Sequence, residues 1–235
     1  MDHALAAAFA LAWPLWVLRR EGAYRETVRA GVPGARLAAY AGAMVTQWLF
    51  ASAAVGLWIH RGRDWGEIGL RGLAGGRAWT GLLVAAVLGG FFLAQSAVVA
   101  RRPALHDEVR AALLRYRELL PAHRSDLTGF LALSITAGVC EELLFRGLLP
   151  WYLGHGLPAW AAQAAALALF AAAHLYLGWM AVVRAFLAGG AAAGLYLWTG
   201  SLLPGMLLHA AVDAAGGWMA YAVAEAREAP VAPAG

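Results

Sequence analysis

The residues of this chain whose types could do chemistry lie inside apolar runs. Glu141, Glu142 and Arg146 interrupt an otherwise apolar stretch over residues 127–149, which is long enough to cross a bilayer. A charge at bilayer depth costs at least about 2.5 kcal/mol, so such residues normally face a protein interior or a water-filled cavity. Three of them so close together predict a functional site.

Helical spacing divides these three charges. Glu142 and Arg146 are four residues apart, so on a helix they share one face and can form an ion pair. Glu141 points about 100° away from Glu142. We therefore assign Arg146 to hold Glu142 and expect Glu141 to face a cavity as a general base. The alternative is an ion-pair cluster that only fixes helix packing.

Two further motifs lie on later apolar segments. Phe170 precedes His174 by four residues near the end of one segment, and His209 precedes Asp213 by four on another. Each could be structural, as a packing histidine or a His–Asp hydrogen bond. If they converge with Glu141, they could activate water and stabilise an oxyanion, or bind a divalent metal such as zinc through Glu141, His174 and His209.

The ordered set of motifs resembles a known family. Glu141-Glu142-x-x-x-Arg146, Phe170-x-x-x-His174 and His209-x-x-x-Asp213, in this order on successive apolar segments, are similar to the CPBP family of intramembrane proteases, the CAAX-protease and bacteriocin-processing family. The runs Phe145-Arg146-Gly147 and Thr199-Gly200-Ser201-Leu202-x-Pro204 also resemble the family pattern. The resemblance covers residues 127–223.

The resemblance implies a role for each motif. Glu141 and His174 would activate the attacking water, and His209 with residue 213 would stabilise the oxyanion. Glu142, Arg146 and Phe170 would support these four. Family members often have Asn where this chain has Asp213. An ionised Asp cannot donate a hydrogen bond to an oxyanion, so Asp213 is either protonated or orients His209 or a metal.

Composition agrees with a membrane protein. Hydrophobic residues make up 62% of the 235 residues and charged residues 14%, whereas soluble domains have about 25% charged residues. The net charge of +4 comes from arginines in loops between apolar runs, which favours membrane orientation over nucleic-acid binding. The single cysteine, Cys140, excludes an internal disulfide, and we expect it to be a small buried hydrophobe.

The hydropathy pattern predicts an all-α, polytopic transmembrane bundle of about seven helices. The apolar segments are residues 4–18, 38–59, 78–100, 127–153, 157–175, 178–198 and 202–223. An amphipathic helix at the membrane surface is expected within 101–126. Within one integral membrane domain, we expect N-terminal helices over 1–126, a catalytic core over 127–224 and a disordered tail over 225–235. Gln47 is expected to form an interhelical hydrogen bond.

The arginines predict an orientation. Residues 19–36 form an arginine-rich linker, which with 101–126 is expected on the cytoplasmic side. Successive membrane helices cross in opposite directions, so residues 60–77 would then lie outside. The four arginines of this loop favour the cytoplasmic side instead. Glu141 and His174 can lie at the same depth in the membrane only if the helix that contains Glu141 enters the membrane near Ser134 rather than at Leu127.

The sequence therefore predicts an intramembrane endopeptidase in the plasma (inner) membrane. Its partners would be the lipid bilayer and a membrane-associated protein or peptide, processed at a CAAX-type or leader sequence. Serine and cysteine chemistry is disfavoured, because Ser134, Ser201 and Cys140 have no base at helical spacing. The alternatives are a transporter or proton relay, which also uses intramembrane Glu, His and Asp, and a non-catalytic protein that binds a membrane partner.

Overall fold

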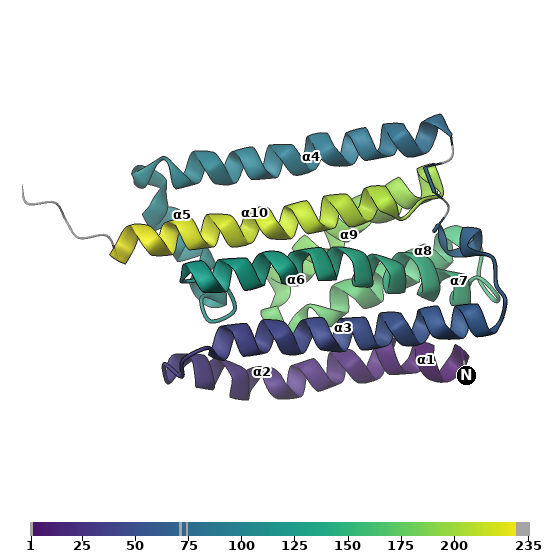
Figure 1. Cartoon of the computed structure of the whole chain (residues 1–235), viewed down its shortest axis with the longest axis horizontal. Helices are drawn as coiled ribbons and strands as arrows, with labels where there is room; N and C mark the ends of the chain where they lie inside the picture. Colours follow the sequence, from purple (N-terminus) through teal and green to yellow (C-terminus); the bar gives the residue numbers. More distant parts are fainter. Residues whose placement is uncertain (1, 71, 74, 229–235) are drawn as a thin grey trace, which may run out of the picture.

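The fold is a bundle of long helices that run back and forth along one direction (Figure 1). The computed structural model describes residues 2–70, 72–73 and 75–228, and all regular structure in them is helical. In chain order, the elements are α1 (Asp2–Ala7), η1 (Ala8–Ala12), α2 (Trp13–Arg29), α3 (Ala35–His60), η2 (Trp65–Ile68), α4 (Gly76–Ala100), η3 (Pro103–Leu105), α5 (His106–Leu113), η4 (Leu114–Tyr116), α6 (Arg124–Glu142), η5 (Leu143–Leu148), α7 (Leu149–Leu153), α8 (Ala159–Ala173), η6 (Leu175–Leu177), α9 (Trp179–Thr199) and α10 (Leu203–Glu228).

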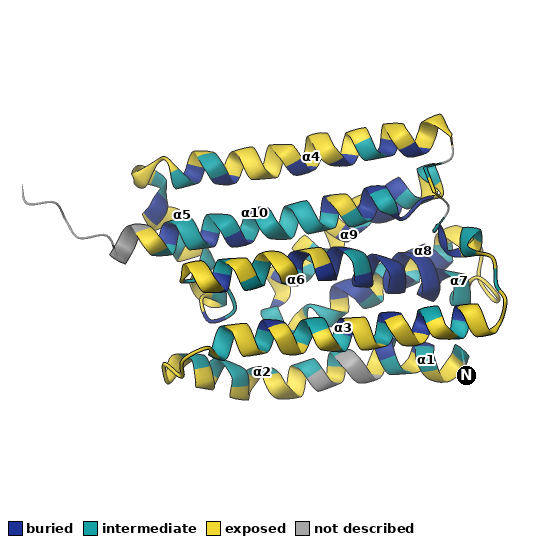
Figure 2. Cartoon of the chain, viewed as in Figure 1, coloured by how far each residue is buried: buried dark blue, intermediate teal, exposed yellow. Residues whose placement is uncertain are grey.

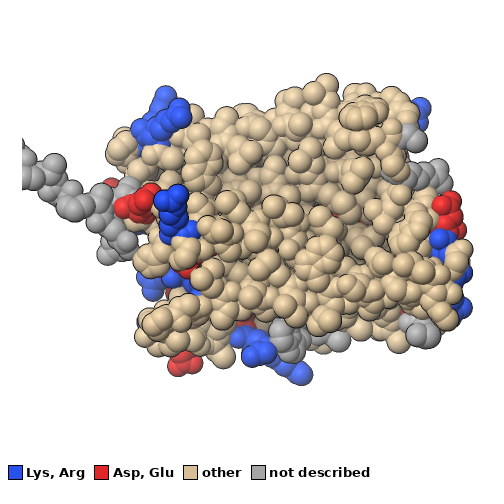
Figure 3. Space-filling view, in the orientation of Figure 1, with Lys and Arg blue, Asp and Glu red and all other residues tan. Residues whose placement is uncertain are grey.

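The bundle has the surface of a membrane protein. Most charged side chains gather at its two ends, and the flank between them is largely uncharged (Figure 3). Five helical segments in the described residues are long and apolar enough to cross a membrane: Ala35–His60, Gly76–Ala100, Arg124–Leu153, Ala159–Leu177 and Trp179–Thr199. The predicted all-α transmembrane bundle is thus confirmed, and the number of about seven crossing helices stays a prediction.

Helix α4 illustrates why these sequences form lipid-facing helices. Leu83, Val87 and Phe91, spaced four apart, are more than 60% exposed on its outer side, and this face is yellow in Figure 2. The opposite face carries small residues, where a Cβ added to Gly89 would lie 2.7 Å from the Cβ of Ala211. Glycine there lets α4 and α10 approach closely, as is usual between membrane helices.

The first segment is longer than predicted. Helix α2 continues to Arg29, so much of the predicted linker over residues 19–36 is helical. An ion pair between Glu21 and Arg25, one turn apart, is compatible with this helical continuation. Arginine stems can also cover apolar surface while their charged heads stay in water, so hydropathy alone placed the end of the helix too early.

The predicted surface helix is shorter than expected. A 3₁₀ turn over Pro103–Leu105, the eight-residue helix α5 and a second 3₁₀ turn over Leu114–Tyr116 replace one continuous helix. Its amphipathic pattern is present, but the chain turns away after Tyr116. At the other end of the chain, α10 extends through Glu228, which corrects the tail predicted to begin at residue 225. Residues 229–235 of that tail lie outside the described residues.

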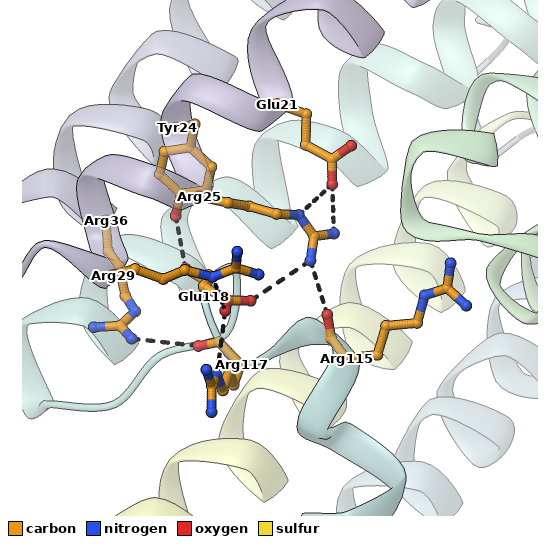
Figure 4. A network of polar contacts seen from close by, with 8 residues as sticks. All are labelled: Glu21, Tyr24, Arg25, Arg29, Arg36, Arg115, Arg117 and Glu118. Carbon is orange, nitrogen blue, oxygen red and sulfur yellow. Dashed lines mark hydrogen bonds and ion pairs between the residues drawn. The ribbon is translucent and has the colours of Figure 1, made fainter.

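A polar network fixes the chain after the surface helix to the end of α2 (Figure 4). The buried Glu118 carboxylate accepts hydrogen bonds from Arg29, at 2.8 Å, and from Arg117, at 3.2 Å. Its backbone carbonyl accepts another from the Tyr24 hydroxyl. Arg25 lies 3.5 Å from the same carboxylate and donates to the carbonyl oxygen of Arg115. The N-terminal helix and the surface helix are thereby joined at one end of the bundle.

Candidate active site

The two adjacent glutamates stand at a change in helix type. Glu141 and Glu142 end α6, and the following residues, Leu143–Leu148, form a π-helical turn before α7. π-Helical turns are rare and occur mostly as single turns at functional sites. Every residue from Cys140 to Pro150 is buried, including Cys140 itself, as predicted. The site therefore lies inside the bundle.

Arg146 and Glu142 form the predicted ion pair. Nη1 of Arg146 lies 3.0 Å from Oε1 of Glu142, and each side chain is about 1% exposed. The guanidinium carbon also lies 4.0 Å from the centre of the Phe170 ring, a cation–π contact. A Cβ added to Gly189 would lie 2.3 Å from Nη2 of Arg146. Glycine in α9 thus makes room for the arginine, which is held between three helical segments.

His209 of α10 reaches both glutamates. Its Nδ1 lies 2.8 Å from Oε1 of Glu142, and its Nε2 lies 3.9 Å from Oε2 of Glu141. Nε2 is also 3.6 Å from Oδ2 of Asp213, one turn further along α10. His209 therefore lies between the two carboxylates. They diverge along α6, but an imidazole from a crossing helix bridges them.

The approach of α10 to α6 depends on Gly138. A Cβ added there would lie 2.8 Å from the carbonyl oxygen of Met206 and 2.9 Å from the Cβ of Ala210. The backbones of the two helices are thus almost in contact one turn before Glu141. This close crossing is what brings His209 to the two glutamates.

His174 lies just beyond the end of α8 and has a defined tautomer. Its Nδ1 is 2.8 Å from the carbonyl oxygen of Phe170. A carbonyl oxygen can only accept, so Nδ1 carries the hydrogen, and in the neutral ring Nε2 is left as a proton acceptor. The Phe170 ring packs edge-on against His174 and His209, with centroids 4.7 and 6.0 Å away. The hydrogen bond to the backbone thus leaves Nε2 of His174 able to accept a proton.

Glu141 and His174 line the same small cavity, of about 40 Å³. Such a volume can hold about one or two water molecules. The remaining walls are formed by Pro14, Val17, Phe145, Phe170, Ala173 and Tyr176. His209 and Asp213 do not belong to the described lining and approach Glu141 from α10. The structure therefore brings together the four predicted site residues, with Glu141 and His174 facing the cavity.

A comparison with protein-family models shows what this segment is similar to. Residues 123–215 match the model described as type II CAAX prenyl endopeptidase Rce1-like. Over these residues the chain is similar to the Rce1-like family. The family resemblance drawn from the motifs is confirmed. No significant match to a curated protein or to a solved structure was found.

The Rce1-like segment contains the motif residues, but other parts of the chain complete the site. Gln47 of α3 donates from Nε2 to Oε1 of Glu141, at 2.9 Å. The interhelical bond predicted for Gln47 is thus confirmed, although spacing could not identify its partner. Pro14 and Val17 of α2 also wall the cavity. Sequence reasoning missed these two and Tyr176, because apolar or aromatic residues in a membrane helix carry no distinguishing signal.

A metal ligand set is not assembled in the Rce1-like segment. In the described parts of the chain, no three His, Cys, Asp or Glu side chains are grouped to hold a metal ion. Both nitrogens of His209 face carboxylates, and Nδ1 of His174 is bonded to a carbonyl. The observed arrangement does not fit a metal held by Glu141, His174 and His209, and zinc as a cofactor stays a prediction.

Proposed function

We propose that the chain is an intramembrane endopeptidase in which Glu141 and His174 activate a water molecule. The observation that carries this proposal is the shared cavity. Two groups able to accept a proton, one from α6 and one from the end of α8, line a space of about 40 Å³ with mostly apolar walls. Positioning a water between two bases contributes to both proximity and general-base catalysis.

In the proposed step, the carbonyl group of a substrate peptide bond enters beside this water. Glu141 accepts a proton from the water, and the oxygen attacks the carbonyl carbon to form a tetrahedral intermediate. His174 orients the water through Nε2. The proton then passes from Glu141 to the leaving nitrogen, the C–N bond breaks, and a carboxylic acid and an amine are released. No covalent bond to the enzyme is formed.

His209 is proposed as the group that stabilises the negative oxygen of the intermediate. Its Nδ1 is held by Glu142, which is itself paired with Arg146. Nε2 then carries a hydrogen only in the doubly protonated ring. We propose that the carboxylates around His209 keep it in this form, so that Nε2 can donate to an oxyanion near Glu141. Asp213, 3.6 Å from the same nitrogen, is proposed to orient His209, since an ionised carboxylate cannot itself stabilise an oxyanion.

The proposed substrate is a peptide segment at the membrane surface. The description of the Rce1-like family favours the C-terminal part of a prenylated protein, and another membrane-associated peptide is the alternative. We propose the plasma membrane as the location. The N-terminal helix α2 covers one wall of the cavity with Pro14 and Val17, so we propose that substrate enters beside this helix.

The proposal is tested by incubating the detergent-purified protein with a library of prenylated and unprenylated membrane-derived peptides. Mass spectrometry of the products identifies the bond that is cut. We expect internal peptide-bond cleavage that is absent from Glu141→Gln and strongly reduced in His174→Ala. Cleavage that survives both substitutions would refute the pair. Proton or solute flux in vesicles without any cleavage would favour a transporter instead.

A further inference from the structure

We propose that Gln47 is a positioning residue that holds the Glu141 carboxylate in its working orientation. This inference rests on the proposed role of Glu141 as the base. Gln47 lies in α3, outside the Rce1-like segment at residues 123–215. It therefore gives the N-terminal half a direct part in the site, in addition to the wall that α2 supplies.

The geometry fixes one oxygen of Glu141 and leaves the other available. Nε2 of Gln47 donates to Oε1 at 2.9 Å. Within the described residues, this is the one hydrogen bond that the Glu141 carboxylate accepts. Oε2 faces His209 at 3.9 Å, too far for a hydrogen bond. A carboxylate held at one oxygen cannot rotate freely, so its second oxygen is kept toward the reacting water.

The energetics of Gln47 argue against a role in folding alone. Its side chain is only 4% exposed, and its Oε1 forms no hydrogen bond with any described residue. A buried polar atom without a partner destabilises the fold. The same face of α3 is otherwise formed by residues that pack, such as Ala51, Ala54 and Trp58. An apolar side chain of the same length would suit that face at least as well.

The first test replaces the amide by an apolar side chain of similar length, as Gln47→Met. We expect kcat to fall about 10- to 100-fold, the range for losing a hydrogen bond to a charged group, with KM unchanged. The midpoint of thermal unfolding should not fall. The matched control is Ser96→Ala, which removes another buried interhelical hydrogen bond, from Ser96 of α4 to the carbonyl of Ala215. This control should keep its kcat.

The second test needs no activity. The unfolding midpoint is compared for Gln47→Met in the wild-type protein and in a Glu141→Met background. In that background Gln47 has lost its partner, so removing the amide should raise the midpoint more than it does in the wild type. Such non-additivity measures the coupling between the two side chains.

The outcomes separate this inference from the proposed function. Equal midpoint shifts in both backgrounds, or an unchanged kcat in Gln47→Met, would overturn the positioning role while leaving Glu141 as the base. A loss of stability in Gln47→Met with no change in kcat would make Gln47 a packing residue. Undiminished cleavage by Glu141→Gln would instead refute the proposed function, whatever the midpoints show.

Discussion

At the scale of single residues, the site depends on a buried chain of charges. Arg146 neutralises Glu142, and Glu142 holds His209 next to Glu141. Both glutamates and Arg146 are buried and His209 is partly buried, so removing one charged group leaves its neighbour without a partner that offsets its loss of water. The pair Glu142 and Arg146 was predictable, because helical spacing sets neighbours within one helix. The bridge through His209 was not, since it depends on how α10 crosses α6.

Replacing Arg146 by Met should strongly destabilise the protein. The change leaves the Glu142 carboxylate buried without its cation, which typically costs about 3–5 kcal/mol. The double variant Glu142→Met with Arg146→Met should recover much of that loss, because no buried charge remains. It should stay inactive, since His209 has lost its anchor. Thermal unfolding and peptide cleavage measure the two effects.

A double variant no more stable than Arg146→Met alone would contradict this account of the pair. It would mean that the arginine stabilises the fold mainly through its contact with Phe170, 4.0 Å from the guanidinium carbon. Lysine at position 146 provides a further comparison, because it keeps the charge and loses the planar guanidinium.

At the scale of helices and turns, close crossings place the side chains. Hydropathy and helical spacing predicted where most helices lie, but not the π-helical turn after Glu142, the continuation of α2 to Arg29 or the short surface helix. These features depend on tertiary contacts, on arginine stems covering apolar surface and on the polar network around Glu118. No local pattern encodes them.

The crossing of α6 and α10 can be tested at Gly138. Substitution by Ala should place its Cβ 2.8 Å from the carbonyl oxygen of Met206. Overpacking of this kind typically costs about 1–3 kcal/mol, and displacement of α10 should move His209 away from Glu141. We expect a lower unfolding midpoint and at least tenfold lower activity.

Gly194→Ala is the matched control for Gly138. It lies within α9, and a Cβ there would meet no atom within 4 Å. Ala favours helix over Gly, so this variant should be as stable as the wild type or more stable, with full activity. Similar behaviour of the two variants would show that the close crossing is unimportant.

The attachment of the surface helix should depend on pH through Glu118. Burial alone would raise the pKa of Glu118, but hydrogen bonds from Arg29 and Arg117 outweigh it and lower the pKa below its ordinary value. The carboxylate therefore contributes stability above its unfolded-state pKa of about 4.3, and that contribution is lost as pH falls through the folded-state pKa.

This is measured by comparing unfolding midpoints of the wild type and Glu118→Gln across pH. The difference should be constant above about pH 5.5, where the unfolded-state carboxyl group is also ionised, and should shrink at lower pH. A difference that does not change with pH would show that the Glu118 charge makes no contribution.

At the scale of the whole molecule, the distribution of charge predicts how the bundle sits in a membrane. Most charged side chains lie at the two ends, and the flank seen between them is largely uncharged (Figure 3). The all-α bundle could be predicted because apolar runs of bilayer length require helices. The arginines predict the sidedness less directly, since both ends of the bundle carry them and the loop over residues 60–77 opposes the alternation of helix directions.

Single-cysteine labelling tests the predicted orientation. The single native cysteine, Cys140, is 0% exposed, so background labelling should be low. Arg61 and Arg102 are exposed residues that follow α3 and α4, at opposite ends of the bundle (Figure 1). In intact cells, an impermeant maleimide should label Arg61→Cys from outside, and should label Arg102→Cys only after the membrane is opened. Labelling of both from the same side would contradict the predicted topology.

The central claim is that Glu141 takes a proton from the attacking water. The most direct measurement is the kcat of peptide cleavage by purified Glu141→Gln, relative to the wild type, with equal unfolding midpoints required of both. Loss of a general base typically lowers the rate by about 10²- to 10⁴-fold, and this account predicts a loss within that range. A folded Glu141→Gln protein that cleaves at the wild-type rate would contradict it.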